Sequence, residues 1–287
     1  MPSLIDIRRR IRSVRNTQQI TKAMKMVSAA KLRRAQDRVI AARPYAALIR
    51  KVLANLAVAV EADERAASNP LLARRSEGRV LLLLFTSDKG LAGAFNANLI
   101  KAAQKFIEEH GDAELELETI GRKGRDFFRK RGARIVAEHI GILNAPRFED
   151  AAAIARQAID RFRSGEIDAV YLLNNEFKSM VAQRLSVARL LPVEIPPNAE
   201  VVDYIFEQPP NQMLESLLPR YVETEVYRSM LETGAAEHAA RMMAMEAATS
   251  NASDMIETLT LYMNRVRQAS ITKEIIEVVS GAAAAAE

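Results

Sequence analysis

Apolar residues recur at alternating steps of three and four along the N-terminal part of the chain, the spacing of a heptad stripe on one long helix. The stripe runs from Leu4 to Val14 and again from Leu32 to Val60. Between these ranges the stripe positions are polar, namely Gln18, Thr21 and Lys25. The pattern predicts an N-terminal coiled-coil helix over residues 1–60 whose stripe has a polar interval.

Residues 210–287 show the same spacing and predict a second long helix, with Pro209 and Pro210 at its start because proline suits a first helical turn. Its apolar stripe contains Met245, Ala248, Ala252, Met255, Leu259, Tyr262, Val266 and Ala269, and resumes at Ile276. We expect the two helices to pair antiparallel. The C-terminal helix should extend past its partner and end in a narrow uncharged tip, Gly281 followed by five alanines.

Residues 77–207 alternate short apolar runs with amphipathic stretches, and nine of the eleven glycines lie between Gly78 and Gly165. This alternation predicts a mostly parallel sheet with helices on both faces. The expected strands are 79–86, 114–120, 133–138 and 167–173, the expected helices are 95–109, 124–130 and 149–163, and two added strands are expected at 178–191 and 201–206. The predicted fold class is α/β, a long antiparallel coiled coil of the two terminal helices with an inserted Rossmann-like, mostly parallel α/β domain.

Composition narrows the function. Of the 287 residues, 49% are hydrophobic and 27% are charged, which excludes a mainly disordered chain. No apolar run approaches the ~20 residues that span a bilayer. The absence of cysteine excludes disulfides, thiol catalysis and Cys-ligated zinc. With 5% aromatic residues and no Trp, a stacking platform for single-stranded nucleic acid is poorly supplied.

Charge is divided unevenly along the chain. Residues 1–51 carry fourteen Lys or Arg against two acidic residues, a net charge of +12, so the rest of the chain carries −7 of the total of +5. We expect the basic N-terminal helix to pair with the more acidic C-terminal helix. The outer faces of the pair include Met24, Met26, Met242 and Met243. Exposed methionines on a long helix pair indicate that another protein encloses it.

The loop at residues 87–96 follows the first strand, where α/β folds often bind phosphate. It lacks the Lys-Ser/Thr end of a Walker loop and the three-glycine dinucleotide motif, so we interpret it as a tight turn into a helix. The histidines are isolated, and no metal-ligand spacing or hydrolase motif occurs, so we expect no catalytic, metal or cofactor site. Two alternatives stay open, a nucleotide-binding α/β enzyme and a basic coiled-coil protein that binds nucleic acid.

Several motifs resemble the gamma subunit of rotary ATP synthases. They are NTQQITKAMKMV from Asn16, TSDKGLAGAFN from Thr86, RMMAMEAATSNA from Arg241 and NRVRQASITKE from Asn264. The resemblance spans residues 3–284 and begins at the start of the chain, which favours a bacterial-type subunit without a transit peptide. At Ala92 and Ala94 the family often has Cys and Gly, so these two positions need neither a thiol nor a positive φ.

The resemblance implies a non-catalytic central rotor stalk that couples proton flow to ATP synthesis and hydrolysis. It implies one copy per complex, enclosed by three catalytic beta and three non-catalytic alpha subunits. Further implied partners are the epsilon subunit and the membrane ring of c subunits, with no nucleic acid. The implied location is peripheral, on the cytoplasmic face of the bacterial inner membrane.

The resemblance also assigns contact residues. The positions that match contacts to the catch loops of the catalytic subunits are Arg267, Gln268, Thr272 and Glu274. Met24, with Lys22, is expected to lie opposite them on the N-terminal helix, so that a cation at position 24 would lie beside Arg267. Within residues 203–207, Tyr204 and Glu207 match the foot on the membrane ring. An ordinary edge strand is the alternative for that segment.

Overall fold

The computed structural model describes residues 3–60, 69–180, 182–194 and 208–285. The chain forms two compact units, one made of Met1–Ser28 with Met242–Glu287 and the other of Ala29–Arg241. Helix α1 (Leu4–Val60) and helix α6 (Pro210–Ala285) each contribute residues to both units. The two long terminal helices expected from the heptad spacing are therefore confirmed.

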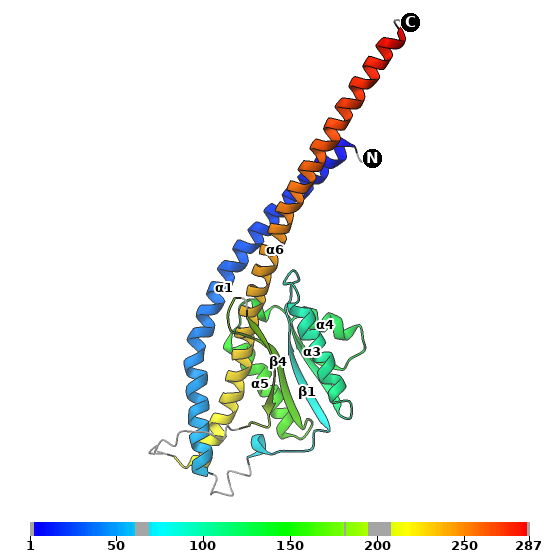
Figure 1. The fold of residues 1–287 in the computed structure, drawn as a ribbon. Coiled ribbons are helices and arrows are strands. Elements are labelled where there is room, and N and C mark those ends of the chain that lie inside the picture. The colour runs from blue at the N-terminus through cyan, green and yellow to red at the C-terminus, as the bar shows by residue number, and fades with distance from the viewer. Residues whose placement is uncertain (1–2, 61–68, 181, 195–207, 286–287) are drawn as a thin grey trace. The chain divides into compact units, whose positions relative to one another are not determined.

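The larger unit contains the sheet. Within its described residues, five strands pair in the order β3-β2-β1-β4-β5 (Figure 1). The strands are β1 (Arg79–Phe85), β2 (Glu114–Ile120), β3 (Ile135–His139), β4 (Ala169–Phe177) and β5 (Gln183–Leu191). Neighbours among the first four pair in parallel, and β5 is antiparallel to β4. The mostly parallel sheet is confirmed, and the strand expected at 201–206 lies outside the described residues.

Helices cover both faces of this sheet, as expected. The connecting elements are η1 (Pro70–Leu72), α3 (Phe95–Glu109), α4 (Arg122–Arg129), η2 (Ile142–Asn144) and α5 (Phe148–Arg163). Strand β1 is buried on both faces because alternate side chains point to opposite sides. Leu82 and Leu84 pack with α3 and α4, whereas Leu81 and Leu83 pack with α5.

The core on the α5 face also contains residues of the terminal helices. Helix α1 contributes Leu53 and Leu56 to it. Helix α6 contributes Leu214, Leu218, Val222, Val226 and Met230. Burial of large aliphatic side chains stabilises such a core by roughly 1.5 to 3 kcal/mol each. Segments of both terminal helices therefore pack against the α5 face of the sheet.

The smaller unit is an antiparallel helix pair. Gln18 Nε2 donates to Ser253 Oγ at 2.6 Å, the Thr21 and Thr249 hydroxyl oxygens are 2.8 Å apart, and Lys25 pairs with Glu246. As the residue number rises along α1, the number of its partner falls along α6, which confirms the antiparallel pairing in this unit. All three contacts use the polar positions of the α1 stripe, so the polar interval faces the partner helix.

The apolar stripe of α6 departs from the expectation at alternate positions. Met255 and Tyr262 are 47% and 40% exposed, while the neighbouring Ile256 and Met263 are half-buried. The expected positions Ala252 and Leu259 do face the pair. Met255 and Tyr262 each precede another apolar residue, so the spacing alone did not decide which of the two turns inward.

Candidate interaction surfaces

The glycine-containing loop after β1 is held by bonds within the chain. The Ser87 backbone N–H donates to Asn96 Oδ1 at 2.9 Å, and the Ser87 hydroxyl donates to the Lys89 carbonyl at 2.5 Å. The Asp88 carboxylate accepts from the backbone N–H groups of Arg122 and Gly141, both at 3.0 Å. A phosphate cradle needs free N–H groups that point at a ligand. The contacts of this loop are those of a structural turn.

Backbone geometry in this loop agrees with the two departures from the family motif. Ala94 has φ −81°, and Ala92 is not among the described residues with positive φ. The positive φ values fall on Leu91, at 61°, and Gly93, at 56°. Alanine therefore fits positions 92 and 94 without strain.

Arg241 of α6 connects that helix to the loop. Its guanidinium donates to the Gly90 carbonyl at 3.2 Å and to the Glu237 carboxylate at 2.6 Å. Both side chains are buried, and burial raises the pKa of Glu237 despite the opposing effect of Arg241. An ion pair of this kind depends on both partners, because either charge alone would be poorly solvated.

The basic residues of α1 are mostly exposed. In the described part of the chain, Lys25 and Arg50 form ion pairs with α6, to Glu246 and Glu225. The exposed cations between residues 8 and 38 are Arg8, Arg9, Arg10, Arg12, Arg15, Lys22, Arg33, Arg34 and Arg38. Each of the two units therefore presents positive charge on its α1 segment.

The C-terminal end of α6 exposes apolar residues. In the smaller unit, residues 271–282 are all exposed, and α6 continues past the N-terminal end of α1 (Figure 1). The large apolar side chains in this stretch are Ile271, Ile275, Ile276, Val278 and Val279, with Val278 71% exposed. Met26 and Met243 are also exposed, as expected, whereas Met24 and Met242 are half-buried. Contiguous exposed apolar surface of this kind marks an interaction site.

The predicted contact residues on α6 lie on this same segment. Arg267, Gln268, Thr272 and Glu274 are all exposed. The Thr272 hydroxyl donates to the Gln268 carbonyl at 3.0 Å, and Glu274 accepts from Ser270 Oγ at 3.3 Å. These are bonds within one helix, so the outward faces of the four side chains are accessible to a partner.

The expected position of Met24 and Lys22 is wrong. Thr21 pairs with Thr249, so Met24 and Lys22 lie at the level of residues 246–249. Arg267 lies 18 residues further along α6, about 27 Å away at the rise of a helix. A cation at position 24 would therefore not lie beside Arg267, and the polar interval of α1 is not at the level of residues 267–274. Tyr204 and Glu207 lie outside the described residues.

Among the described helices, none is both long and apolar enough to cross a membrane. A family model described as ATP synthase matches residues 3–285. The ATP synthase gamma chain of Solibacter usitatus (strain Ellin6076) is 69% identical over 285 residues, covering 99% of this chain and 100% of the relative. The ATP synthase gamma chain of Anaeromyxobacter sp. (strain Fw109-5) is 51% identical over 289 residues, covering 99% of each chain.

Solved structures give the same result for the fold. A chain in the Tetrahymena thermophila mitochondrial ATP synthase central stalk and c-ring structure is 25% identical, with a TM-score of 0.62. That match covers 80% of this chain and 99% of the other. A chain of the Euglena gracilis mitochondrial ATP synthase is 18% identical, with a TM-score of 0.68, and the match covers 98% of this chain and 94% of the other.

Proposed function

The chain belongs to the ATP synthase gamma chain family, and on that premise we propose a role for each of its surfaces in the central rotor stalk. The stalk is a non-catalytic part of the complex. It transmits torque between the membrane ring and the three catalytic sites, which couples proton flow to ATP synthesis and hydrolysis. One copy serves each complex, at the cytoplasmic face of the bacterial inner membrane.

The exposed apolar end of α6 carries the proposal. Ile275, Ile276, Val278 and Val279 have no cover within the described chain. We assign three beta and three alpha subunits as the sleeve around this end. Apolar contacts without directional bonds suit a bearing, because the hydrophobic effect is non-directional and permits sliding.

The exposed cations of α1 in the smaller unit are assigned to the inner surface of the same sleeve. Residues 8–22 present six exposed Lys or Arg side chains. Acidic surfaces on the enclosing subunits would attract them over a distance of about 10 Å at moderate salt. This attraction centres the helix pair without fixing one rotational position.

The polar residues of α6 are assigned to contacts that form and break during rotation. Arg267, Gln268, Thr272 and Glu274 can make hydrogen bonds of about 1 kcal/mol net each to the catch loops of the beta subunits. Lys22 and Met24 are assigned to a separate contact with the beta subunits, because the helix register puts them about 27 Å from Arg267 along the axis of the helix pair. Tyr204 and Glu207 are assigned to the foot on the c-ring, near the epsilon subunit.

Reconstitution with purified alpha and beta subunits tests this role. We expect no ATPase activity from the isolated chain and restored activity after mixing. Arg267→Ala combined with Gln268→Ala should lower turnover roughly 5- to 30-fold, which corresponds to about 1 to 2 kcal/mol of lost transition-state contact. Arg265→Ala is the matched control, since Arg265 is exposed on the same turn and has no assigned contact. ATP turnover by the isolated chain would refute the proposal.

A further inference from the structure

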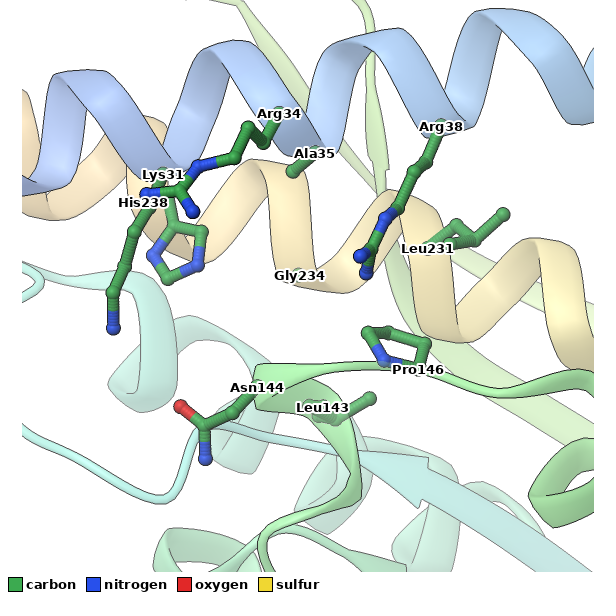
Figure 2. Close-up of a pocket in the computed structure, with 10 residues that line it drawn as sticks. All are labelled: Lys31, Arg34, Ala35, Arg38, Leu143, Asn144, Pro146, Leu231, Gly234 and His238. Carbon is green, nitrogen blue, oxygen red and sulfur yellow. The ribbon is translucent and has the colours of Figure 1, made fainter.

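A cavity of about 130 Å³ lies in the larger unit between α1, α6 and the segment at η2. Lys31, Arg34 and Arg38 line it from α1, His238 lines it from α6, and Asn144 lines it from the η2 side. Figure 2 shows the three basic side chains extending from α1 toward the other two elements. No residue of the assigned rotor contacts takes part in this cavity.

The described lining of the cavity is positively charged. It includes three cationic side chains and no Asp or Glu. Glu237, which interacts electrostatically with Lys31, is already paired with Arg241. In the part of the chain that the structure describes, Lys31 and Arg38 form no ion pair, and Arg34 Nε donates to the Ala30 carbonyl of its own helix at 3.4 Å. Three cations around one small space repel each other, and an anion between them would remove that repulsion.

His238 adds a buried polar group that lacks a partner. The side chain is 6% exposed, and its Nδ1 has no hydrogen-bond partner among the described residues. Burial lowers the pKa of His238 to about 4, with further lowering by Arg241 and Lys31, so the imidazole is neutral near pH 7. A neutral imidazole has one N–H donor, and a buried polar group without a partner costs about 1 to 3 kcal/mol.

The size of the cavity restricts the ligand. A volume of 130 Å³ exceeds the ~30 Å³ of one water in the liquid and is well below the ~300 Å³ at which pockets accept larger organic ligands. The available donors are two guanidinium groups, an ammonium and an imidazole, which suit an oxyanion with several acceptor oxygens. A compact ion with about two negative charges matches both properties.

We propose that this cavity binds inorganic phosphate, held by Lys31, Arg34 and Arg38 and by an N–H of His238. The bound ion connects α1 to the η2 segment. Gly141 N–H and the Asn144 side-chain amide at that segment already donate to Asp88, at 3.0 and 3.4 Å. Phosphate thereby braces the α1 helix against the α/β domain within the larger unit, and this proposal does not depend on the rotor role.

The test is a titration of the full-length chain with sodium phosphate, followed by the imidazole resonances in ¹⁵N-labelled protein. The chain has three histidines, so His110 and His139 serve as internal references. We expect saturable movement of the His238 signal and none at the other two. Sodium chloride at matched ionic strength should leave His238 unchanged. An unchanged His238 signal with phosphate would overturn the proposal.

Variants locate the binding. Arg34→Gln and Arg38→Gln should each weaken phosphate binding at least about tenfold, the factor for one lost charge-assisted hydrogen bond. Arg33→Gln is the matched control, because Arg33 is exposed on the same turn and does not line the cavity. Circular dichroism checks that the variants remain folded. If Arg33→Gln weakened phosphate binding equally, the phosphate would be held by non-specific electrostatic attraction to the basic helix, and the proposal would be contradicted.

An ADP titration identifies the source of the phosphate group. The cavity is too small for a nucleoside, so ADP should move the His238 signal much less than free phosphate at the same concentration. A larger response to ADP would overturn the assignment to free phosphate.

Discussion

The hydroxyl oxygens of Thr21 and Thr249 lie 2.8 Å apart across the helix pair of the smaller unit. Each hydroxyl is also within reach of a carbonyl of its own helix, 3.0 Å for Thr21 to Gln18 and 2.7 Å for Thr249 to Met245. A hydroxyl has one proton, so only one of the two can donate across the pair while the other donates to its own helix.

A double-mutant cycle with Thr21→Val and Thr249→Val should therefore show a coupling of about 0.5 to 1.5 kcal/mol. The double variant should be at least as stable as the native chain, because apolar stripe positions favour helix pairing. Urea unfolding at constant m-value measures both quantities. Thr258→Val is the control, since Thr258 is exposed and, among the described residues, its hydroxyl bonds only to the Asp254 carbonyl of its own helix. Additive single effects would disprove the bond across the pair.

Gly121→Ala should destabilise the chain by at least about 3 kcal/mol. Gly121 has φ +107°, and a Cβ there would lie 1.9 Å from the Thr86 carbonyl oxygen. Gly132→Ala is the comparison, because Gly132 has φ +71° with no heavy atom within 4 Å of a Cβ. Its cost should be about 1 to 2 kcal/mol, from the backbone alone. Equal costs in urea unfolding would mean that the contact with Thr86 relaxes without penalty.

Arg241→Gln should cost about 3 to 5 kcal/mol, because Glu237 would remain buried without its partner. Burial raises the pKa of Glu237, and the variant should raise it further. A raised carboxyl pKa gives stability that is present at low pH and lost as pH rises, so the deficit should be larger at pH 8 than at pH 5. Adding Glu237→Gln should recover at least half of the loss, and no recovery would show that the carboxylate is not the cause.

The native chain should lose stability between pH 6.5 and about 4 through His238. Its folded pKa is lowered to about 4, so the unfolded chain binds the proton first as pH falls. The loss approaches about 3 kcal/mol. Glu232 and Glu237 have raised pKa values and change stability in the opposite direction, so His238→Gln is needed to isolate the effect. In phosphate-free buffer the stability difference between native chain and variant should follow this range of pH, and a constant difference would contradict it.

Ile276→Ser combined with Val279→Ser should change the stability of the isolated chain by no more than about 0.5 kcal/mol, since both side chains are exposed. In the reconstituted complex the same variant should lower assembly yield or turnover, because the sleeve would lose its apolar contact. Glu277→Gln, between the two positions, should leave both unchanged. Full activity of the double serine variant would remove the bearing role from this segment.

The α/β domain was predictable because its local signals agree. The run at residues 80–85 is apolar at every position, which fits a strand buried on both faces, and α3 was expected at 95–109 because its apolar residues repeat on one face. The start of β4 was expected at residue 167, where Ile167 is buried but precedes the pairing that begins at Ala169. An apolar run predicts which residues are buried, but it does not predict at which residue the hydrogen bonding to the neighbouring strand begins.

Helix register was not predictable in the same way. A heptad stripe repeats every seven residues, so sliding one helix by seven along the other preserves the pattern. The pattern therefore could not test the position of Met24 near Arg267, which was expected from the family resemblance and which the pairs Thr21–Thr249 and Lys25–Glu246 contradict. The cavity was missed for the same reason, since Lys31 and His238 come together only through the register.

The core on the α5 face has a consequence for protein synthesis. Leu53 and Leu56 of α1 are buried in the same core as Leu214 to Met230 of α6. Ile7 and Ile11 of α1 are buried in the smaller unit, to which α6 contributes its residues from 242 onward. The ribosome makes these partners about 200 residues apart, which takes roughly 10 to 40 s at ~5–20 residues per second. Until then, the part of the α1 stripe that packs on α6 lacks its partner helix, whereas Leu53 and Leu56 can already contact β1 and α5 of the same core. The N-terminal part of α1 can therefore bury its apolar stripe only after translation has reached the second half of α6.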